Sequence, residues 1–442
     1  MIEPRTLKGF RDYLPAAMLQ REVLIETARR VYRSYGFSPI DTPALEYFEI
    51  LAGKGGEEAD RQIYAFKDQG GRKVGLRFDL TVPLARFAAQ HISELGTPLK
   101  RYHIATVWRG EAPQRGRYRE FMQCDFDIVG ADSVAADIET TLVIIDLMKA
   151  LGFERFAVRL NHRGVLNGLL EKLGLADSGP AVLRALDKIA KIPRDKVADE
   201  MMAAAGATAE QVDQVLSLSE MTGDAVEVLR QLEKLVAGAA RGEAGVARLK
   251  DITEAAHAAG APPTQLRIDP AIARGLDYYT GVVFETFLDE LPGIGSVCSG
   301  GRYDHLAERY TRRRLPGVGA SLGLDRLLAA MEELQLTTAA AAPCPVFIPW
   351  FAADALPEYL KVASALRGAG LGAEVSCELK KLGKQLQYAD RRGFSVAVIA
   401  GPDELQAGRW QVKDLATKET QDVGATDGEA ELIAAVRTVI ER

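Results

Sequence analysis

The chain has 442 residues, which is too long for one ordinary domain and predicts two or three. Hydrophobic residues make up 47% of it and charged residues 26%, the proportions of a globular protein that buries large cores. The formal net charge of -6 excludes a general polycation, so any nucleic-acid contact would need basic residues gathered on a local face.

The cysteines and the N-terminus bear on the compartment. The four cysteines form no CxxC pair, which disfavours a structural zinc site and a disulfide framework; they are Cys124, Cys298, Cys344 and Cys377. The first residues lack the apolar stretch of a signal peptide, and no apolar run is long enough to span a bilayer. We therefore expect a cytoplasmic protein with reduced thiols.

In chain order, apolar residues at helical spacing predict a helix over 17–34, ended by Tyr35-Gly36. Residues 74–81 alternate apolar and polar side chains and predict a strand. Residues 99–110 and 120–130 flank a polar loop and predict a long antiparallel hairpin.

The second strand of this hairpin has two different faces. One face is apolar, and the other carries Gln123, Asp125 and Asp127. Such a pattern is typical of a half-buried strand, whose polar face is commonly solvated. Because residues 74–81 repeat the pattern, we favour a polar cleft floored by strands.

From about 165 to 260 the sequence is helical, and β-type sequence returns at 264–270 and 278–287. Glycine-rich segments follow at 293–304 and 317–331. Residues 337–345 form a proline-punctuated linker. Beyond it, a β-α-β-α-β order predicts a small α/β domain with a partly parallel sheet.

Several familiar catalytic motifs are absent, namely the P-loop, HExxH and GxSxG. The five histidines show no metal-ligand spacing, and we expect no protein-held metal. Four arginines beside strands and glycines stand out: Arg109, Arg274, Arg302 and Arg326. An arginine fork binds phosphate oxygens bidentately, so several converging on one cleft would suit a triphosphate. Any one of these arginines, taken by itself, is more commonly part of a surface ion pair.

Together these segments resemble the class II aminoacyl-tRNA synthetases, and specifically the histidyl enzymes. Three segments resemble class motifs 1, 2 and 3: YGFSPIDTPALE (35–46), VWRGEAPQRGRYREFMQCDFDIVG (107–130) and GVGASLGLDRLL (317–328). Two further segments are peculiar to histidyl enzymes: RGLDYYTG (274–281) and SGGRYD (299–304). The resemblance runs from about residue 6 to about residue 440.

The resemblance implies a role for each matching position. The α-amino group of histidine would be held by Asp79, Leu80, Thr81 and Gln123, and its imidazole side by Asp127, Tyr278 and Tyr279. Arg109 would contact both the α-phosphate and the histidine carboxylate, and Arg274 would also lie at the α-phosphate. ATP would further be bound by Glu111, Phe121 and Arg326.

The resemblance also implies the reaction. Histidine attacks the α-phosphorus of ATP through its ionised carboxylate, so activation needs positioning and charge neutralisation rather than a general base. We expect Arg109 and Arg274 to supply that charge, with Mg²⁺ bound between phosphates of ATP. The adenylate then passes histidine to the 3′ end of tRNA(His).

Further implied contacts involve tRNA and a second subunit. Gln114 and Arg115 are candidates for the tRNA acceptor end. A basic cluster near 380–392 is the candidate anticodon face, although a solvated charged face is a serious alternative; it comprises Lys380, Lys381, Lys384, Arg391 and Arg392. Motif 1 builds the subunit interface in this class, so we expect a homodimer.

The predicted fold is an α/β class II core built on an antiparallel sheet, with a helical insertion and a C-terminal α/β anticodon-binding domain. Its expected limits are 1–164 and 261–336 for the core, 165–260 for the insertion, 337–345 for the linker and 346–442 for the last domain.

Three alternative functions fit the sequence less well. A non-catalytic, histidine-binding regulatory subunit of ATP phosphoribosyltransferase has a similar fold but lacks the C-terminal domain and part of the catalytic set. An RNA-sensing module would sit beside a kinase domain, which this sequence lacks. Another class II specificity would leave RGLDYYTG and SGGRYD unexplained.

Overall fold

The computed structural model describes residues 1–53, 60–112, 116–189, 192–273, 278–336, 342–424 and 429–442. They form two compact units. The core unit comprises Met1–Asp12 and Val23–Leu336, and the second unit comprises Tyr13–Glu22 and Thr337–Arg442. No described helix has the length and apolar character needed to cross a membrane.

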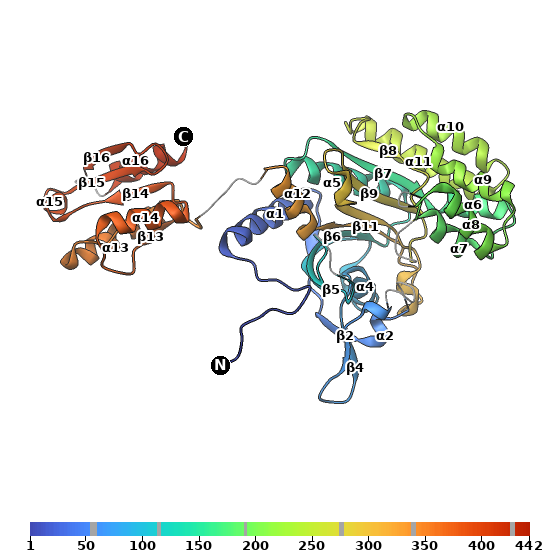
Figure 1. Ribbon diagram of the computed structural model, residues 1–442, viewed down its shortest axis with the longest axis horizontal. Helices are drawn as coiled ribbons and strands as arrows, with labels where there is room; N and C mark the ends of the chain where they lie inside the picture. Colours follow the sequence, from blue (N-terminus) through green and yellow to red (C-terminus); the bar gives the residue numbers. More distant parts are fainter. Residues whose placement is uncertain (54–59, 113–115, 190–191, 274–277, 337–341, 425–428) are drawn as a thin grey trace. The chain divides into compact units, whose positions relative to one another are not determined.

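An eight-stranded sheet organises the core unit (Figure 1). Its inner neighbours are all antiparallel, and only its two edges, β1 with β5 and β7 with β8, are parallel. This confirms the predicted antiparallel sheet. In spatial order the strands are β1 (Ser38–Pro39), β5 (Leu99–Trp108), β6 (Glu120–Val129), β11 (Gly317–Gly323), β10 (Cys298–Arg302), β9 (Val282–Leu288), β7 (Phe156–His162) and β8 (Leu266–Ile268).

The predicted hairpin is β5 and β6, paired without interruption from Leu99 opposite Val129 to Trp108 opposite Glu120. The expected half-burial of β6 is wrong. Its residues from Gln123 to Val129 are all buried, the polar ones included. The polar side chains of this part of β6 are therefore largely shielded from bulk solvent.

A second, three-stranded sheet has the order β2 (Leu45–Tyr47), β4 (Lys73–Leu76) and β3 (Ala65–Lys67). The strand predicted over 74–81 ends at Leu76, because helix α4 (Thr81–Leu95) begins at Thr81. The Asp79 carboxylate accepts a hydrogen bond from Val82 N at 3.0 Å, which satisfies one of the unpaired N–H groups of the first turn. Local capping thus overrides the alternating pattern.

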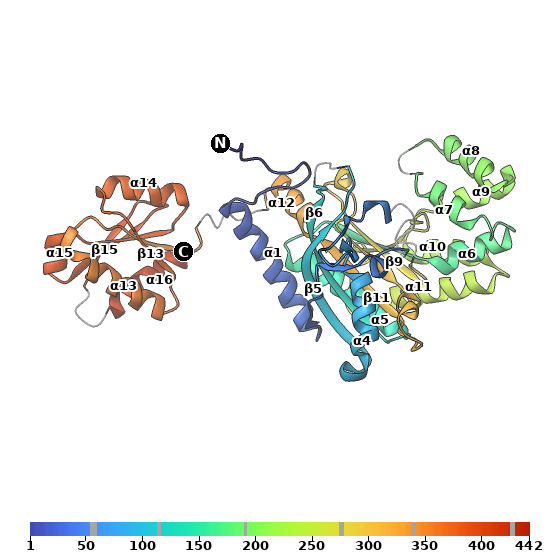
Figure 2. The same ribbon diagram turned by 90° about the horizontal axis from the view of Figure 1, so that it is seen from below.

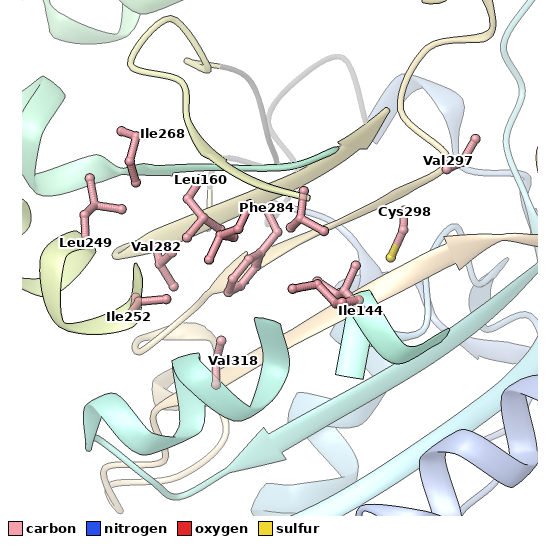
Figure 3. Packing of buried hydrophobic residues seen from close by; sticks show 14 of the residues in the cluster. Ile144, Leu160, Leu249, Ile252, Ile268, Val282, Phe284, Val297, Cys298 and Val318 are labelled. Atoms are coloured by element: carbon pink, nitrogen blue, oxygen red, sulfur yellow. The ribbon is translucent and has the colours of Figure 1, made fainter. Parts of the chain in front are cut away.

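The main hydrophobic core lies between the sheet and the helices α5 (Val134–Ala150), α12 (Leu324–Glu333) and the part of α1 (Pro15–Ser34) that belongs to the core unit. Figure 3 shows Ile144 of α5 among side chains of the strands, including Phe284, Cys298 and Val318. Burying this face leaves the opposite face of the central strands to form the cleft.

Between β7 and β8 every regular element among the described residues is a helix (Figure 2). The first and last of them touch backbone to backbone, since a Cβ on Gly168 would lie 2.4 Å from Gly242 N. The α-helices are α6 (Arg163–Lys172), α7 (Gly179–Leu186), α8 (Arg194–Ala205), α9 (Ala209–Leu216), α10 (Ala225–Val236) and α11 (Ala240–Ala258).

The second unit contains a five-stranded sheet with its own core. The predicted β-α-β-α-β run is present, and its three strands are parallel. Two antiparallel strands extend the sheet. In spatial order the strands are β13 (Ala373–Val375), β12 (Val346–Ile348), β14 (Val396–Ile399), β15 (Arg409–Asp414) and β16 (Thr420–Gly424), and the helices include α13 (Leu356–Gly368), α14 (Leu382–Arg392) and α16 (Ala430–Ile440).

Candidate active site

A cleft of about 860 Å³ lies over the central strands of the core unit and adjoins a smaller cavity of about 130 Å³. Arg109, Gln123 and Arg326 line both, so the two cavities form one continuous site. A site of this size and mixed polarity is typical of a small-molecule pocket.

The strand register explains the polar floor of the cleft. Asp125 pairs with Ser321, Ser321 with Ser299, and Ser299 with Glu285. Directly paired residues point to the same face of a sheet, so these four side chains form one polar row. Ser321, Ser299 and Glu285 line the cleft, although no motif in the sequence marks them as site residues.

The glycines of β10 and β11 allow the backbone to come this close. A Cβ on Gly319 would lie 2.2 Å from Asp127 Oδ1, and one on Gly300 would lie 2.1 Å from Gly319 O. Any side chain at either position would displace the carboxylate or separate the strands. The glycine-rich segments are therefore close-packed parts of the floor.

Asp79 and Thr81 line one end of the cleft together with Tyr278. Tyr278 donates its hydroxyl hydrogen to Asp79 Oδ2 at 3.2 Å. Burial raises the pKa of Asp79 above its ordinary value, although Val82 N–H and Arg109 oppose the shift. Leu80 does not line the cleft; its side chain is fully buried in a cluster with Val107.

The imidazole-side residues lie at the same end. Tyr278 and Tyr279 pack edge to face with ring centroids 5.1 Å apart, and both line the cleft. Asp127 is 2% exposed and lies beneath the floor, where it ion-pairs with Arg101 at 2.7 Å and accepts a hydrogen bond from Tyr303. Burial raises the pKa of Asp127, whereas Arg101 and Tyr303 lower it.

The residues assigned to ATP lie toward the smaller cavity, which Arg109, Glu111, Phe121 and Arg326 all line. Arg109 donates from Nε to Phe78 O at 2.9 Å, and its guanidinium lies 5.1 Å from the ring centroid of Phe121. Arg326 donates to the carbonyl of Ser296. Two arginine forks are thus anchored on backbone carbonyls at the site where phosphate is expected.

Arg302 does not belong to this group, and its expected place among converging arginines is wrong. It is 4% exposed and donates from Nε and Nη2 to Asp137 at 2.9 and 2.7 Å. Its partners on α5 hold it away from the cleft. Arg274, Gln114 and Arg115 lie outside the described residues, so their assignments stay predictions.

In the second unit, Lys384, Arg391 and Arg392 lie on α14, whereas Lys380 and Lys381 precede its first residue, Leu382. Lys380 pairs with Glu378. The five basic side chains therefore share a segment but not a single helix, and their role remains a prediction.

Two of the histidines have structural roles, His103 buried and His162 partly buried. Burial lowers the pKa of His103 to about 4, and its Nε2 is 2.9 Å from Asp41 Oδ1. His162 caps α6 by accepting from Gly164 N at 3.0 Å. In the part of the chain that is described, no three His, Cys, Asp or Glu side chains form a group that could hold a metal ion.

Comparison with known proteins assigns both units. The family model described as histidyl-tRNA synthetase matches residues 9–327, and the anticodon binding domain model matches residues 345–434. The histidine–tRNA ligase of Rhodopirellula baltica is 62% identical over 423 residues, 96% of each chain. That of Treponema denticola is 43% identical over 436 residues, again 96% of each chain.

Solved structures agree with the sequence matches. The histidyl-tRNA synthetase of a Nostoc species superposes with a TM-score of 0.89 at 34% identity, covering 99% of this chain and all of that one. A Bacillus halodurans structure described as an ATP phosphoribosyltransferase regulatory subunit/histidyl-tRNA synthetase has a TM-score of 0.74 over 90% of this chain and 99% of that one, and at 23% identity it supports the fold alone.

Proposed function

Since the chain belongs to the histidyl-tRNA synthetase family of class II aminoacyl-tRNA synthetases, we propose that its central cleft activates L-histidine with ATP and transfers it to tRNA(His). The chain is accordingly an ATP-dependent histidine–tRNA ligase. The observation that carries the assignment to this cleft is that one continuous cavity is lined by residues from both sets, among them Thr81 and Tyr279 assigned to histidine and Arg326 assigned to ATP.

At the histidine end, Asp79, Thr81 and Gln123 would hold the α-ammonium group. Gln123 donates from Nε2 to Ser321 Oγ at 2.6 Å, which fixes the amide and leaves Oε1 without a partner in the described structure. A buried acceptor without a partner costs free energy until a ligand donor reaches it. Tyr278, Tyr279 and the buried Asp127 would surround the imidazole, and Leu80 would contribute through its backbone.

At the nucleotide end, Arg109 would neutralise charge at the α-phosphate and orient the histidine carboxylate, together with Arg274. Glu111 and Phe121 would frame the adenine, and Arg326 would grip the terminal phosphate. A carboxylate needs no general base to attack phosphorus, so two arginines would suffice for positioning and charge neutralisation.

Mg²⁺ would enter with ATP and offset the charge of its phosphates. The cleft lining includes carboxylates, Glu285 and Glu333 among them, and carboxylate oxygens with substrate phosphates are the ligands that Mg²⁺ prefers.

For tRNA, we propose that Gln114 and Arg115 contact the acceptor end and that the basic residues of 380–392 contact the anticodon. We further propose that the protein is a cytoplasmic homodimer. Its domains would be a core of 1–164 and 261–336, a helical insertion of 165–260 and an anticodon-binding domain of 346–442, with 337–345 as the linker. Leu45, Tyr47 and Phe66 support the homodimer, because these exposed apolar side chains lie together on the small sheet beside motif 1.

The test is amino-acid-dependent exchange of labelled pyrophosphate into ATP. We expect exchange with histidine alone among the amino acids, and a loss of about 100-fold or more in kcat/KM for Arg109→Gln, because this arginine would act on the transition state. Arg194→Gln, at an exposed ion pair on α8, is the matched control and should exchange normally.

Absence of exchange with every amino acid, from folded wild-type protein that binds histidine, would contradict the enzymatic proposal. Such a result would instead favour the regulatory function. Exchange that survives in Arg109→Gln would contradict only the role of this arginine.

A further inference from the structure

Arg101 is a fully buried arginine beneath the histidine end of the cleft. It is 0% exposed and is the largest side chain in the described structure that is buried to this degree. A charged guanidinium is stable in such a place only when carboxylates and hydrogen-bond acceptors compensate it. The groups around Arg101 must therefore compensate its charge.

The contacts of Arg101 join two parts of the site. Its Nη2 pairs with Asp127 Oδ2 at 2.7 Å and lies 3.4 Å from the carbonyl oxygen of Leu80. Asp127 is the carboxylate assigned to the imidazole side, and Leu80 belongs to the segment assigned to the α-amino group. One side chain thus links the two ends of the amino-acid pocket.

The strand register makes this pairing specific. Arg101 lies directly opposite Asp127 in the β5–β6 ladder, so the two side chains share the cleft face. Asp127 is held on its other oxygen by Tyr303. Tyr303 thus fixes one oxygen by a hydrogen bond, and the charge of Arg101 lies 2.7 Å from the other, Oδ2, which has no hydrogen-bond partner of its own in the described structure.

We propose that Arg101 is a positioning residue for histidine recognition: it keeps the buried Asp127 ionised and oriented toward the imidazole without touching the substrate itself. The inference rests on the proposed role of Asp127. Neither Arg101 nor Asp127 is among the residues that line the cleft, so the pair acts on the imidazole from beneath the floor. A fixed anion beneath the floor distinguishes an imidazole N–H from an apolar ring of similar size.

The experiment measures KM for histidine and KM for ATP in pyrophosphate exchange for Arg101→Met, Arg101→Lys, Asp127→Asn and the double variant Arg101→Met/Asp127→Asn. For Arg101→Met we expect KM for histidine to rise about 10- to 100-fold, the usual effect of removing the partner of a binding group. KM for ATP should change little. Arg101→Lys should recover part of the loss because it retains the charge.

Two readouts separate positioning from a merely structural role. Without Arg101 the pKa of Asp127 rises further, so the defect of Arg101→Met relative to wild type should shrink as pH increases from 7 to 9. The groups that face Asp127 are Arg101, Tyr303 and Tyr279, with Asp125 on its own strand. In the Asp127→Asn background, Arg101→Met should add no further loss, because both act through one carboxylate.

Lys100→Met is the matched control, since Lys100 is the neighbouring cation on β5 and pairs with Glu139 rather than with a cleft residue. It should leave KM for histidine unchanged. The double variant is neutral and keeps the comparison possible if the buried, unpaired Asp127 of Arg101→Met prevents folding.

A normal KM for histidine in folded Arg101→Met, or losses that add fully in the double variant, would overturn the inference. Wild-type protein that fails to exchange with histidine would instead overturn the proposed function, so the two failures are distinguishable.

Discussion

At the scale of single residues, Asp125 shows how burial alone changes the chemistry of a carboxyl group. It is 1% exposed, and Ser321 lies directly opposite it in the neighbouring strand. Desolvation raises the pKa of Asp125 to about 7, although the nearby Arg101 opposes the shift. At neutral pH this carboxyl is close to its midpoint of titration.

The raised pKa predicts how stability changes with pH. Between pH 4 and pH 7 the folded protein holds a proton on Asp125 that the unfolded chain has lost, so this group makes the folded state less stable as pH rises through that window. Asp125→Asn removes the titration. Its free energy of unfolding should therefore improve relative to wild type with rising pH, by up to about 4 kcal/mol between pH 4 and pH 8.

Unfolding followed by circular dichroism at several pH values measures this difference, with Asp422→Asn on the exposed strand β16 as the control. If the difference in the free energy of unfolding between Asp125→Asn and wild type stays constant from pH 4 to pH 8, the raised pKa of Asp125 is contradicted.

The same residue shows how far sequence could predict the site. Alternation along 120–130 places Asp125, Gln123 and Asp127 on one face, and the structure confirms that common face. Their burial and the pairing of Asp127 with Arg101 were not predicted, because they depend on which residues of other strands lie opposite. Ser299 and Ser321 were not predicted as site residues either, because a single serine carries no local sequence signal.

At the scale of secondary-structure elements, Asp137 connects three parts of the core unit. It is 0% exposed in the first turn of α5 and accepts hydrogen bonds from Arg302 of β10 and from Arg248 Nε of α11 at 2.6 Å. The carbonyl of Arg302 accepts in turn from Thr280 N at 2.7 Å. One buried carboxylate thereby ties the helical insertion to the strand and loop that flank the tyrosines of the cleft.

Asp137→Asn should destabilise the core unit strongly, because removal of one member of a buried ionic network leaves two guanidinium groups partly uncompensated. We expect the free energy of unfolding to fall by about 3 kcal/mol or more. Chemical denaturation monitored by tryptophan fluorescence and circular dichroism measures the change. Glu227→Gln, at an exposed pair with Arg230 on α10, should have little effect. Equal stability of the two variants would contradict the connecting role of Asp137.

Elements with strong periodicity were predicted correctly, and those set by local capping were not. The hairpin of β5 and β6 follows from uninterrupted alternation on both sides of a polar loop. Residues 77–80 continue the alternation of β4 but leave the strand, because Asp79 caps α4. Arg302 resembles Arg109 and Arg326 in local sequence, and its pairing with Asp137 reveals the difference.

At the scale of the whole molecule, the order of the elements followed from composition and periodicity. The helical run between β7 and β8, the proline-punctuated segment 337–345 and the separate α/β unit all have sequence signals. The sequence gives a weaker signal for the association of subunits, because the proposed interface consists of short strands that have little periodicity. Motif 1 supplied the expectation of a homodimer, and we propose the small sheet as the surface that would carry it.

Exposed side chains on the small sheet predict which substitutions would disrupt the dimer. Tyr47 and Phe66 are 50% and 48% exposed, and both lie opposite Val74 in one cross-strand row, so they flank it on the same face. Exposed large apolar side chains grouped in this way mark an interaction surface. We expect wild-type protein to have twice the chain mass of 48.0 kDa in solution, and Tyr47→Asp with Phe66→Asp to yield monomers.

Light scattering coupled to gel filtration measures the mass across a range of concentrations. Val226→Asp is the matched control, since Val226 is 76% exposed on α10, away from the small sheet, and its replacement should leave the dimer intact. The two aspartates should disrupt the dimer because a desolvated, unpaired aspartate costs several kcal/mol in an apolar interface, whereas the same side chain stays hydrated on the surface of a monomer. A wild-type monomer would contradict the homodimer itself, and a dimer that persists in the double variant would place its interface on another surface.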